Sequence, residues 1–386
     1  MLNRREFIKF GLLTLASADN NPMRWRVPER LSKILAQLPK NLREPVRFPQ
    51  RFRLQILWSS HTAQGWHHEA YRLGAEWSAP ASMVKVPVAI LALRKLRRLG
   101  LPRSTQLRVL NPAGCASQAS ETAEFEAIEL SLRRMLIVSD NGAYNRLWEF
   151  VGADAMARDL PRFGFPQARL QARLGACSPA DNALGRGYEL ADQNGKLLRT
   201  DRTQRRLRVQ APSPSPQVGN AYYDAEQQLR HQAKDFGASN HWSLGYAHAL
   251  TLGLAGAAPA PLVAQLSADD RAFLTETLAT LPRNCIEPKF SEVDYPDHWG
   301  KFLVFGDRDG RFPEDLQIVN KIGEAYGFLS DSAWIRQGRN ACVLSATLYV
   351  NSDGILNDDK YEYEQLGRPF LAELGRRVLA ASPLPS

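Results

Sequence analysis

The sequence has 386 residues and a formal net charge of +9, with hydrophobic and charged fractions of 44% and 23%. These values are typical of a folded globular protein and exclude a disordered chain, a collagen and a coiled coil. No apolar run is long enough to span a membrane, and the basic residues lack the interleaved aromatic side chains of a nucleic-acid-binding surface. Four cysteines are too few for a disulfide framework at this length, and their spacing does not reveal which of them pair: Cys115, Cys177, Cys285 and Cys342.

The first 18 residues predict an export signal. Arg4 and Arg5 form a twin-arginine pair, an apolar stretch follows at residues 10–15, and residues 16–18 fit a small-residue cleavage site. An amphipathic first helix is the alternative, but the order of pair, apolar stretch and cleavage site favours a signal. We therefore expect a periplasmic or otherwise exported protein with no stable membrane insertion after cleavage.

The predicted elements follow a Pro- and Arg-rich extension at residues 19–50, in which we expect a helix near residues 29–37. Hydrophobic patterning then predicts strands at residues 52–58 and 68–73, a helix from Ser82, and helices at residues 130–138 and 143–151. Residues 176–220 are expected to be irregular, with a hairpin turn at Asn194-Gly195. Helices at residues 244–254 and 268–281 precede strands at residues 318–328, 332–336 and 341–350 and a closing helix at residues 360–381.

Strands at both ends of the chain and helices in the middle favour one sheet made from both termini, with a helical lobe inserted between them. This is an α/β fold of the α+β kind. We expect a single domain over residues 51–386, with a sheet lobe of about residues 51–81 and 315–386 and a helical lobe of about residues 82–314. The sequence shows no internal repeat.

Ser82 and Lys85 place a hydroxyl and an amine three residues apart at the start of a predicted helix, so they share one face. A serine hydroxyl is a poor nucleophile until a base takes its proton, and a lysine can be that base. The positive end of the helix dipole favours negative charge that develops nearby. Alone, the pattern is equally that of a surface serine and a solvated lysine.

Two further motifs carry groups that fit the same chemistry. In Ser139-Asp140-Asn141 a second hydroxyl can relay a proton and an amide can bind a substrate amide. Taken alone, this motif is better explained by an Asx turn that caps the next helix. In Lys321-Ile322-Gly323 a lysine can hold an anionic group, and glycine permits close approach of the backbone.

Taken together, the three motifs resemble those of the penicillin-recognising serine hydrolases, in the same order and the same helix, loop and strand contexts. The flanking residues 81–87 and 135–145 look like the corresponding stretches of class A β-lactamases, and Asn145 matches a structural asparagine of that family. The resemblance covers most of residues 52–380. It implies an antiparallel sheet and an inserted all-helical lobe, the β-lactamase/transpeptidase-like fold.

The resemblance also implies a role for each matching residue. Ser82 would be the acylated nucleophile, Lys85 its base, and Ser139 the proton shuttle. Substrate would be bound by Asn141, by Lys321 and by the Gly323–Glu324 segment. In that segment the backbone N–H of Glu324 would form an oxyanion hole together with that of Ser82.

The sequence departs from the class A pattern in the loop whose glutamate activates the deacylating water. The matching region, residues 170–190, lacks this motif, and Glu189 and Asp181-Asn182 are the candidates for a replacement. The interval of 182 residues between Ser139 and Lys321 is longer than in compact class A enzymes. Slow or absent deacylation would make the protein a penicillin-binding acylase.

The third motif also departs from the pattern. Ile322 stands where a threonine or serine usually helps to bind the substrate carboxylate, and the loss of one charge-assisted hydrogen bond costs about 1.5–3 kcal/mol. The side chain of Glu324 would add negative charge if it faced the cleft.

We therefore expect an exported serine hydrolase that opens β-lactam amides through a Ser82 acyl-enzyme. The alternatives are a D-Ala-D-Ala carboxypeptidase-like amidase or esterase that acts on cell-wall peptides, and a non-catalytic cell-wall or penicillin-binding protein. We expect a small-molecule or cell-wall peptide substrate, a monomer, no nucleic-acid partner, no cofactor and no metal. Mutation of Ser82 to alanine separates an enzyme, which loses turnover, from a binder, which keeps its ligand.

Overall fold

The computed structural model describes residues 28–112, 123–175, 177–203, 205–206 and 211–384. The predicted signal at residues 1–18 lies outside them. The chain forms two compact units, the first made of Met1–Met83, Trp242–Ala260 and Glu292–Ser386, the second of Val84–His241 and Pro261–Ser291. The first unit differs from the sheet lobe that we expected, since residues 242–260 and 292–314 also belong to it. No helix among the described residues combines the length and the apolar character needed to cross a membrane.

The first unit contains a five-stranded antiparallel sheet in the order β13-β14-β15-β1-β2. Its strands are β1 (Gln55–Thr62), β2 (Gly65–Tyr71), β13 (Leu316–Ala325), β14 (Phe328–Gln337) and β15 (Asn340–Tyr349). Strands from the two ends of the chain meet where β1 pairs with β15, with Leu57 opposite Ser345. This confirms the prediction of one antiparallel sheet made from both termini. The strand β13 lies at one edge of this sheet.

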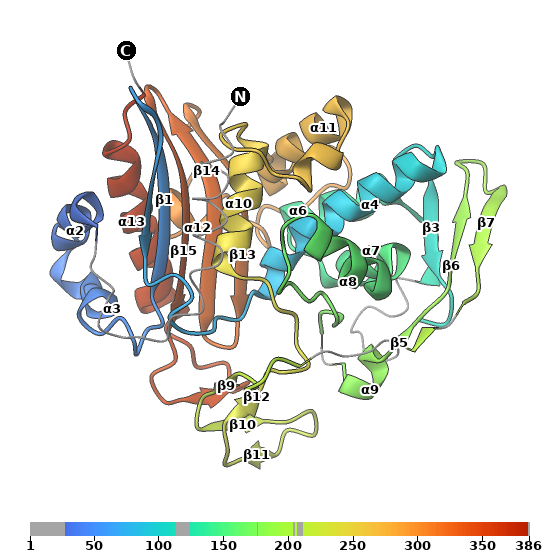
Figure 1. Ribbon diagram of the computed structural model, residues 1–386, viewed down its shortest axis with the longest axis horizontal. Helices are drawn as coiled ribbons and strands as arrows, with labels where there is room; N and C mark the ends of the chain where they lie inside the picture. Colours follow the sequence, from blue (N-terminus) through green and yellow to red (C-terminus); the bar gives the residue numbers. More distant parts are fainter. Residues whose placement is uncertain (1–27, 113–122, 176, 204, 207–210, 385–386) are drawn as a thin grey trace. The chain divides into compact units, whose positions relative to one another are not determined.

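Helices cover both faces of this sheet (Figure 1). They are α2 (Glu29–Ala36), α3 (Glu44–Arg47), α10 (Leu244–Leu254), α12 (Phe302–Phe305) and α13 (Arg368–Ala380). The face against α13 and α2 is a continuous hydrophobic core, to which Phe370, Leu371 and Leu31 contribute. The face against α10 carries buried polar side chains, among them His248 on the helix and Ser345 on the sheet, which are hydrogen-bonded at 2.8 Å.

Backbone geometry explains where the element boundaries differ from the predicted ones. The first strand starts at Gln55 rather than near residue 52 because Arg53 has a positive φ of 44°, which interrupts the extended chain. The predicted strand at residues 318–328 is divided by a turn at Tyr326-Gly327, where both residues have positive φ values of 55° and 79°. That pair of values defines a type I′ hairpin between β13 and β14.

The closing helical segment begins at Tyr363, three residues later than predicted, as a π-helical turn (Tyr363–Gly367) that continues directly into α13 at Arg368. Asn357 and Asp359 have positive φ values, so the chain turns there instead of forming a helix. Pro369 lies at the start of α13, directly after the π-helical turn. The short strand β16 (Ile355–Leu356) precedes this turn.

The second unit is mainly helical around the motifs, as predicted. Its helices are α4 (Lys85–Leu99), α6 (Ile128–Ile137), α7 (Asn141–Val151), α8 (Ala153–Arg162), α9 (Pro179–Asn182) and α11 (Ala268–Ala279). A small sheet has the order β4-β3-β6-β7. Its strands are β3 (Gln106–Val109), β4 (Glu126–Ala127), β6 (Tyr188–Ala191) and β7 (Leu197–Asp201). The antiparallel pairing of β6 with β7 confirms the hairpin predicted at Asn194-Gly195.

The stretch at residues 176–220, which we expected to be irregular, also contains the short strands β5 (Leu184–Gly185), β8 (Arg205–Arg206) and β9 (Gln217–Val218). Three more short strands follow it: β10 (Ala221–Tyr223), β11 (Leu229–Arg230) and β12 (Lys234–Asp235). Cys177 is disulfide-bonded, whereas Cys285 and Cys342 are free and buried. Cys115 lies outside the described residues.

Candidate active site

Ser82 lies on a 3₁₀ turn, η4 (Ala81–Val84), that continues directly into α4. In a 3₁₀ turn, side chains three residues apart eclipse one another, so the turn directs Ser82 to the face of the chain on which Lys85 lies. Ser82 is half-buried, and Ala81 before it has a positive φ of 43°. Such a backbone conformation is costly for a residue other than glycine and is concentrated at functional sites.

Three of the predicted residues meet in the second unit. The side chain of Lys85 is completely buried, and its Nζ donates to Asn141 Oδ1 at 2.8 Å, to Ser139 Oγ at 3.1 Å and to the carbonyl oxygen of Ser139. The amide and carbonyl oxygens only accept hydrogen bonds, whereas the Ser139 hydroxyl can also donate one. A neutral Lys85 amine can therefore donate to Asn141 Oδ1 and to the carbonyl oxygen of Ser139, and it can use its lone pair to take a proton from a hydroxyl.

The loop that carries Ser139 is held by ion pairs beneath it. Asp140 caps α7 by accepting from Ala143 N at 2.8 Å, so the Asx-cap interpretation of this motif is also correct. The other carboxylate oxygen of Asp140 accepts from Arg134 Nη2 at 2.7 Å. Arg134 also donates to Glu126 at 2.8 Å. These contacts fix Ser139 in its left-handed conformation, with a φ of 63°.

The first unit places Gly323 against the turn that carries Ser82. A Cβ at position 323 would lie 2.7 Å from the carbonyl oxygen of Pro80 and 3.1 Å from Met83 Cγ. Only glycine allows β13 to approach the η4 turn this closely.

Strand register directs the N–H of Glu324 away from the sheet. In a two-residue hairpin the pair next to the turn, Ala325 with Phe328, exchanges hydrogen bonds, so the next pair, Glu324 with Leu329, does not. Because β13 is the edge strand, this N–H points away from the sheet at its unpaired edge. The preceding residue, Gly323, is the one that lies against η4. That geometry suits the predicted oxyanion donor.

The side chain of Glu324, which would have added negative charge if it faced the cleft, forms an ion pair instead. Its carboxylate accepts from Arg368 Nη2 at 2.9 Å, and the side chain of Arg368 is only 12% exposed. This ion pair neutralises the carboxylate. Ile322 belongs to the hydrophobic core on the α13 face of the sheet, so its side chain packs among apolar residues.

Lys321 is buried, and burial lowers the pKa of its ammonium group to about 7. The carboxylate of Asp331 opposes this shift, and the nearby ammonium of Lys301 adds to it. Neither neighbour belongs to a motif that the sequence revealed. Lys321 therefore has an unusual electrostatic setting that its Lys-x-Gly motif alone does not predict.

Asn145, on α7, binds the backbone of Leu174 on the loop that follows α8. Its Nδ2 donates to the carbonyl oxygen of Leu174 at 3.0 Å, and its Oδ1 accepts from Leu174 N at 2.9 Å. Asn145 lies one helical turn after Asn141, on the same face of α7, and residues in this relation have Cβ atoms about 5–6 Å apart. The backbone of half-buried Leu174 is thereby fixed to the face of α7 that also carries Asn141.

The carboxylates of both candidates for the missing base, Glu189 and Asp181, already accept hydrogen bonds from protein side chains. Glu189 accepts two hydrogen bonds from Arg108, at 2.7 and 2.8 Å, and is only 8% exposed. Asp181 accepts from Ser178 Oγ at 2.6 Å, while the side-chain oxygen of Asn182 accepts from Arg173 N at 2.9 Å. These groups stabilise the loop and the small sheet.

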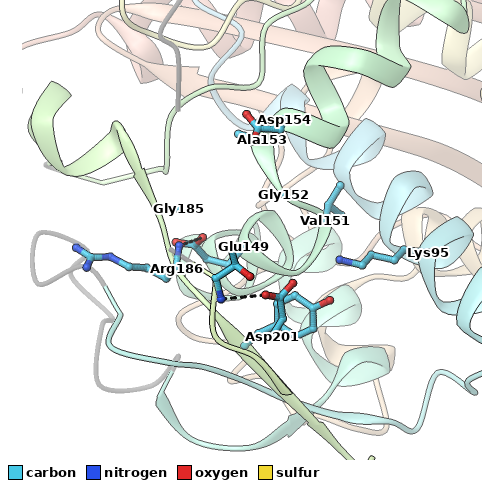
Figure 2. A pocket seen from close by; sticks show the side chains of 11 residues that line it. Lys95, Glu149, Val151, Gly152, Ala153, Asp154, Gly185, Arg186 and Asp201 are labelled. Carbon is cyan, nitrogen blue, oxygen red and sulfur yellow. Dashed lines mark hydrogen bonds between the residues drawn. The ribbon is translucent and has the colours of Figure 1, made fainter. Parts of the chain in front are cut away.

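A pocket in the second unit lies between the end of α7 and the start of α8, and Figure 2 shows Lys95, Glu149 and Asp201 around it. Burial raises the pKa of Glu149, although Arg173 opposes the shift, and Arg186 N donates to its carboxylate at 2.9 Å. The pocket adjoins the C-terminal end of α7, whereas Asn141 begins that helix about 15 Å away. It is therefore separate from the Lys85 cluster.

Part of the chain matches the model of a known protein family. Residues 67–203, which include Ser82, Lys85, Ser139 and Asn141, match the model of the β-lactamase enzyme family. Among curated proteins, none matches the chain.

Solved structures share the fold over nearly the whole length. The β-lactamase of Sphaerobacter thermophilus is 11% identical, with 91% of this chain and 96% of that chain covered and a TM-score of 0.53. PBP-A, solved as a mutant in an acyl-enzyme complex with penicillin G, is 12% identical, with coverages of 91% and 96% and a TM-score of 0.53. An ancestral class A β-lactamase is 18% identical, with coverages of 92% and 100% and a TM-score of 0.50. At these identities the likeness shows the fold alone, and it confirms the predicted β-lactamase/transpeptidase-like architecture.

Proposed function

We propose that this protein is an exported serine hydrolase that forms an acyl-enzyme on Ser82 with amides of the β-lactam and cell-wall peptide class and releases the acyl group slowly. Ser82 Oγ attacks the carbonyl carbon, and its proton passes to Lys85 and then, through the Ser139 hydroxyl, to the departing nitrogen. An ester bond forms as the amide C–N bond breaks. In a β-lactam the nitrogen stays attached through the opened ring. The backbone N–H groups of Ser82 and Glu324 hold the oxyanion.

The observation that carries this proposal is the reciprocal hydrogen bonding of Asn145 with Leu174. It fixes an apolar side chain on the loop where class A enzymes supply the glutamate that activates water. A leucine cannot act as a general base, and a positioned base typically contributes 10²- to 10⁴-fold to such a step. The chain therefore carries the residues that we propose for acylation, whereas a leucine occupies this place on the loop.

Substrate recognition follows from the polar groups of each unit. Because Asn141 Oδ1 accepts from Lys85, the amide of Asn141 is oriented with its Nδ2 available to a substrate carbonyl. Lys321 would hold a substrate carboxylate when it is charged. The ion pair of Glu324 with Arg368 removes the repulsion that a bare carboxylate would exert on such a substrate.

Export is supported by two features of different kinds. The twin-arginine pattern followed by an apolar stretch and a cleavage site is typical of a signal for folded proteins. The disulfide at Cys177 is typical of proteins in an oxidising compartment. Expression with and without residues 1–18, followed by cell fractionation, tests this, and retention of the full-length chain in the cytoplasm would contradict it.

The experiment that tests the activity is labelling with a fluorescent penicillin, combined with a D-Ala-D-Ala peptide whose release of D-alanine is measured. We expect a covalent label on the wild-type protein that the Ser82→Ala and Lys85→Ala variants do not acquire, and inhibition of any D-alanine release by the penicillin. Rapid turnover of a chromogenic cephalosporin would instead establish an efficient β-lactamase. Non-covalent penicillin binding that persists in Ser82→Ala would establish a binding protein.

A further inference from the structure

A buried polar cluster that no motif predicts lies behind Lys321. Neighbouring residues of a strand point to opposite faces, so Asn320 and Asp331 lie on the α13 face, opposite to Lys321. Asn320 Nδ2 donates to Asp331 Oδ1 at 2.8 Å, and Asp331 Oδ2 accepts from Leu303 N at 3.0 Å. Lys301 Nζ donates to Asn320 Oδ1 at 2.8 Å. Lysine, amide and carboxylate therefore form a chain of contacts one residue away from Lys321.

Lys301 also forms a hydrogen bond with the backbone of β13, the edge strand of the sheet. By the alternation set at the hairpin, Ile318 is one of the residues whose backbone groups point away from β14. Its carbonyl oxygen accepts from Lys301 Nζ at 2.9 Å, and Asn320 Nδ2 donates back to the carbonyl oxygen of Gly300 at 2.8 Å. The segment before α12 thus holds β13 at two points, two residues apart, just before Lys321.

The cluster is also a set of coupled charges. Lys301, Lys321 and Asp331 are at most 5% exposed, so the two ammonium groups and the carboxylate act on one another with little screening by water. Burial lowers the pKa of Lys301 to about 7, as it does for Lys321, and raises that of Asp331 to about 6. The charged groups that shift the pKa of Lys321 are Asp331 on β14, which raises it, and Lys301 before α12, which lowers it.

We propose that Lys301 is a positioning residue for Lys321: it fastens the edge strand through Ile318 and Asn320, and together with Asp331 it sets how far Lys321 is charged near neutral pH. The proposal rests on the proposed function, in which charged Lys321 holds the carboxylate of the substrate. A variant that lacks Lys301 loses a repelling cation, so Lys321 stays charged to higher pH. A variant that lacks Asp331 loses an attracting anion, so Lys321 loses its charge at lower pH.

The direct test is a titration of Lys321 by NMR in protein that carries ¹³C at lysine Cε, with the Lys321 signal assigned by its absence from Lys321→Arg. We expect Lys321 to titrate far below an ordinary lysine in the wild type, and to move upward in Lys301→Met and downward in Asp331→Asn by at least about half a pH unit each. The exposed Lys33→Met is the matched control, because it removes the same charge from the same unit. Its Lys321 titration should equal that of the wild type.

The pH dependence of penicillin labelling is the second readout. The labelling rate should fall on the alkaline side at a pH that shifts upward in Lys301→Met and downward in Asp331→Asn. Equal titrations in all variants, or shifts of both in one direction, would overturn the proposal. If Lys301→Met does not fold, the wild-type titration and Asp331→Asn decide. Titration of both Lys301 and Lys321 at the pH of an ordinary lysine would overturn the proposal. Titration of both at a lower pH, with the downward shift of Lys321 in Asp331→Asn, would support it. Absence of labelling in the wild type would contradict the proposed function and leave the NMR result to decide the role of Lys301.

Discussion

At the scale of single residues, the close approach of β13 to η4 depends on the glycine at position 323, which has no side chain. The Cβ of an alanine at position 323 would collide with the backbone carbonyl of Pro80 at 2.7 Å, and a backbone atom cannot rotate away as a side chain can. We expect Gly323→Ala to displace η4, to slow acylation of Ser82 at least about tenfold and to lower the free energy of unfolding by about 1–3 kcal/mol. Stopped-flow labelling and urea denaturation measure these effects.

The control for this substitution is Gly245→Ala in α10. A Cβ at position 245 would meet nothing closer than Leu73 Cδ2 at 3.7 Å, which is an ordinary contact. We expect its labelling rate to match that of the wild type. A wild-type rate in Gly323→Ala as well would show that the close approach of β13 is irrelevant to acylation.

In the proposed function, Leu174 is the residue that we expect to determine how fast the acyl-enzyme is hydrolysed. Leu174→Glu adds a carboxylate where Asn145 fixes the backbone to the face of α7 that also carries Asn141. We expect the penicillin label to be released at least about tenfold faster, because a general base can then activate water. Leu174→Gln is the matched control, with the same size and no basic group, and should release the label at the wild-type rate. Release that is unchanged in Leu174→Glu, with labelling intact, would place the deacylating water elsewhere.

At the scale of elements, the loop between α6 and α7 has a structural role and carries Ser139, to which we assign a proposed functional role. Asp140→Ala removes the cap of α7 and the ion pair with Arg134, so we expect a loss of about 1–2 kcal/mol in the free energy of unfolding. The same change frees the backbone of Ser139, and the labelling rate should fall as well. Calorimetry and labelling kinetics test the two effects separately.

Ser267→Ala provides the comparison for the cap. Ser267 caps α11 by accepting from Asp270 N at 3.1 Å, in the same unit as Asp140. We expect a similar loss of stability with no loss of labelling. Equal labelling rates for the two variants would mean that the loop conformation does not depend on Asp140.

Periodicity was a good guide to these elements because apolar spacing follows directly from burial. It missed the β13–β14 turn, since Tyr326-Gly327 has no asparagine or aspartate at its first position to signal a type I′ turn. The motifs found Lys85, Ser139 and Asn141, which the structure brings together. Leu174 and Lys301 could not be found in this way, because their importance lies in partners far along the chain. Asn145 was the available signal for Leu174.

At the scale of the whole molecule, stability should depend on pH through the buried polar face under α10. His248 lies between Ser59 and Ser345, at 2.8 Å from each hydroxyl, and burial lowers its pKa to about 3. An unfolded histidine titrates near 6.5, so between pH 6.5 and 3 the unfolded chain binds more protons than the folded one. Stability is therefore lost as the pH falls through this window.

We expect His248 to account for roughly 3–5 kcal/mol of that loss. His248→Gln should lower stability at neutral pH but flatten its dependence between pH 6.5 and 3, as measured by urea denaturation at a series of pH values. His231→Gln, which changes an exposed histidine, should keep the wild-type slope. A slope that is equally steep in His248→Gln would show that other groups cause the acid sensitivity.

The central claim is a Ser82 ester that forms readily and persists, and intact-mass spectrometry after removal of excess penicillin tests it most directly. We expect the wild-type protein to gain the mass of one penicillin, Ser82→Ala to gain none, and the adduct to decay over many minutes. A protein that gains no mass and hydrolyses no penicillin would contradict acylation at Ser82. A protein that consumes penicillin rapidly without accumulating the adduct would contradict slow deacylation.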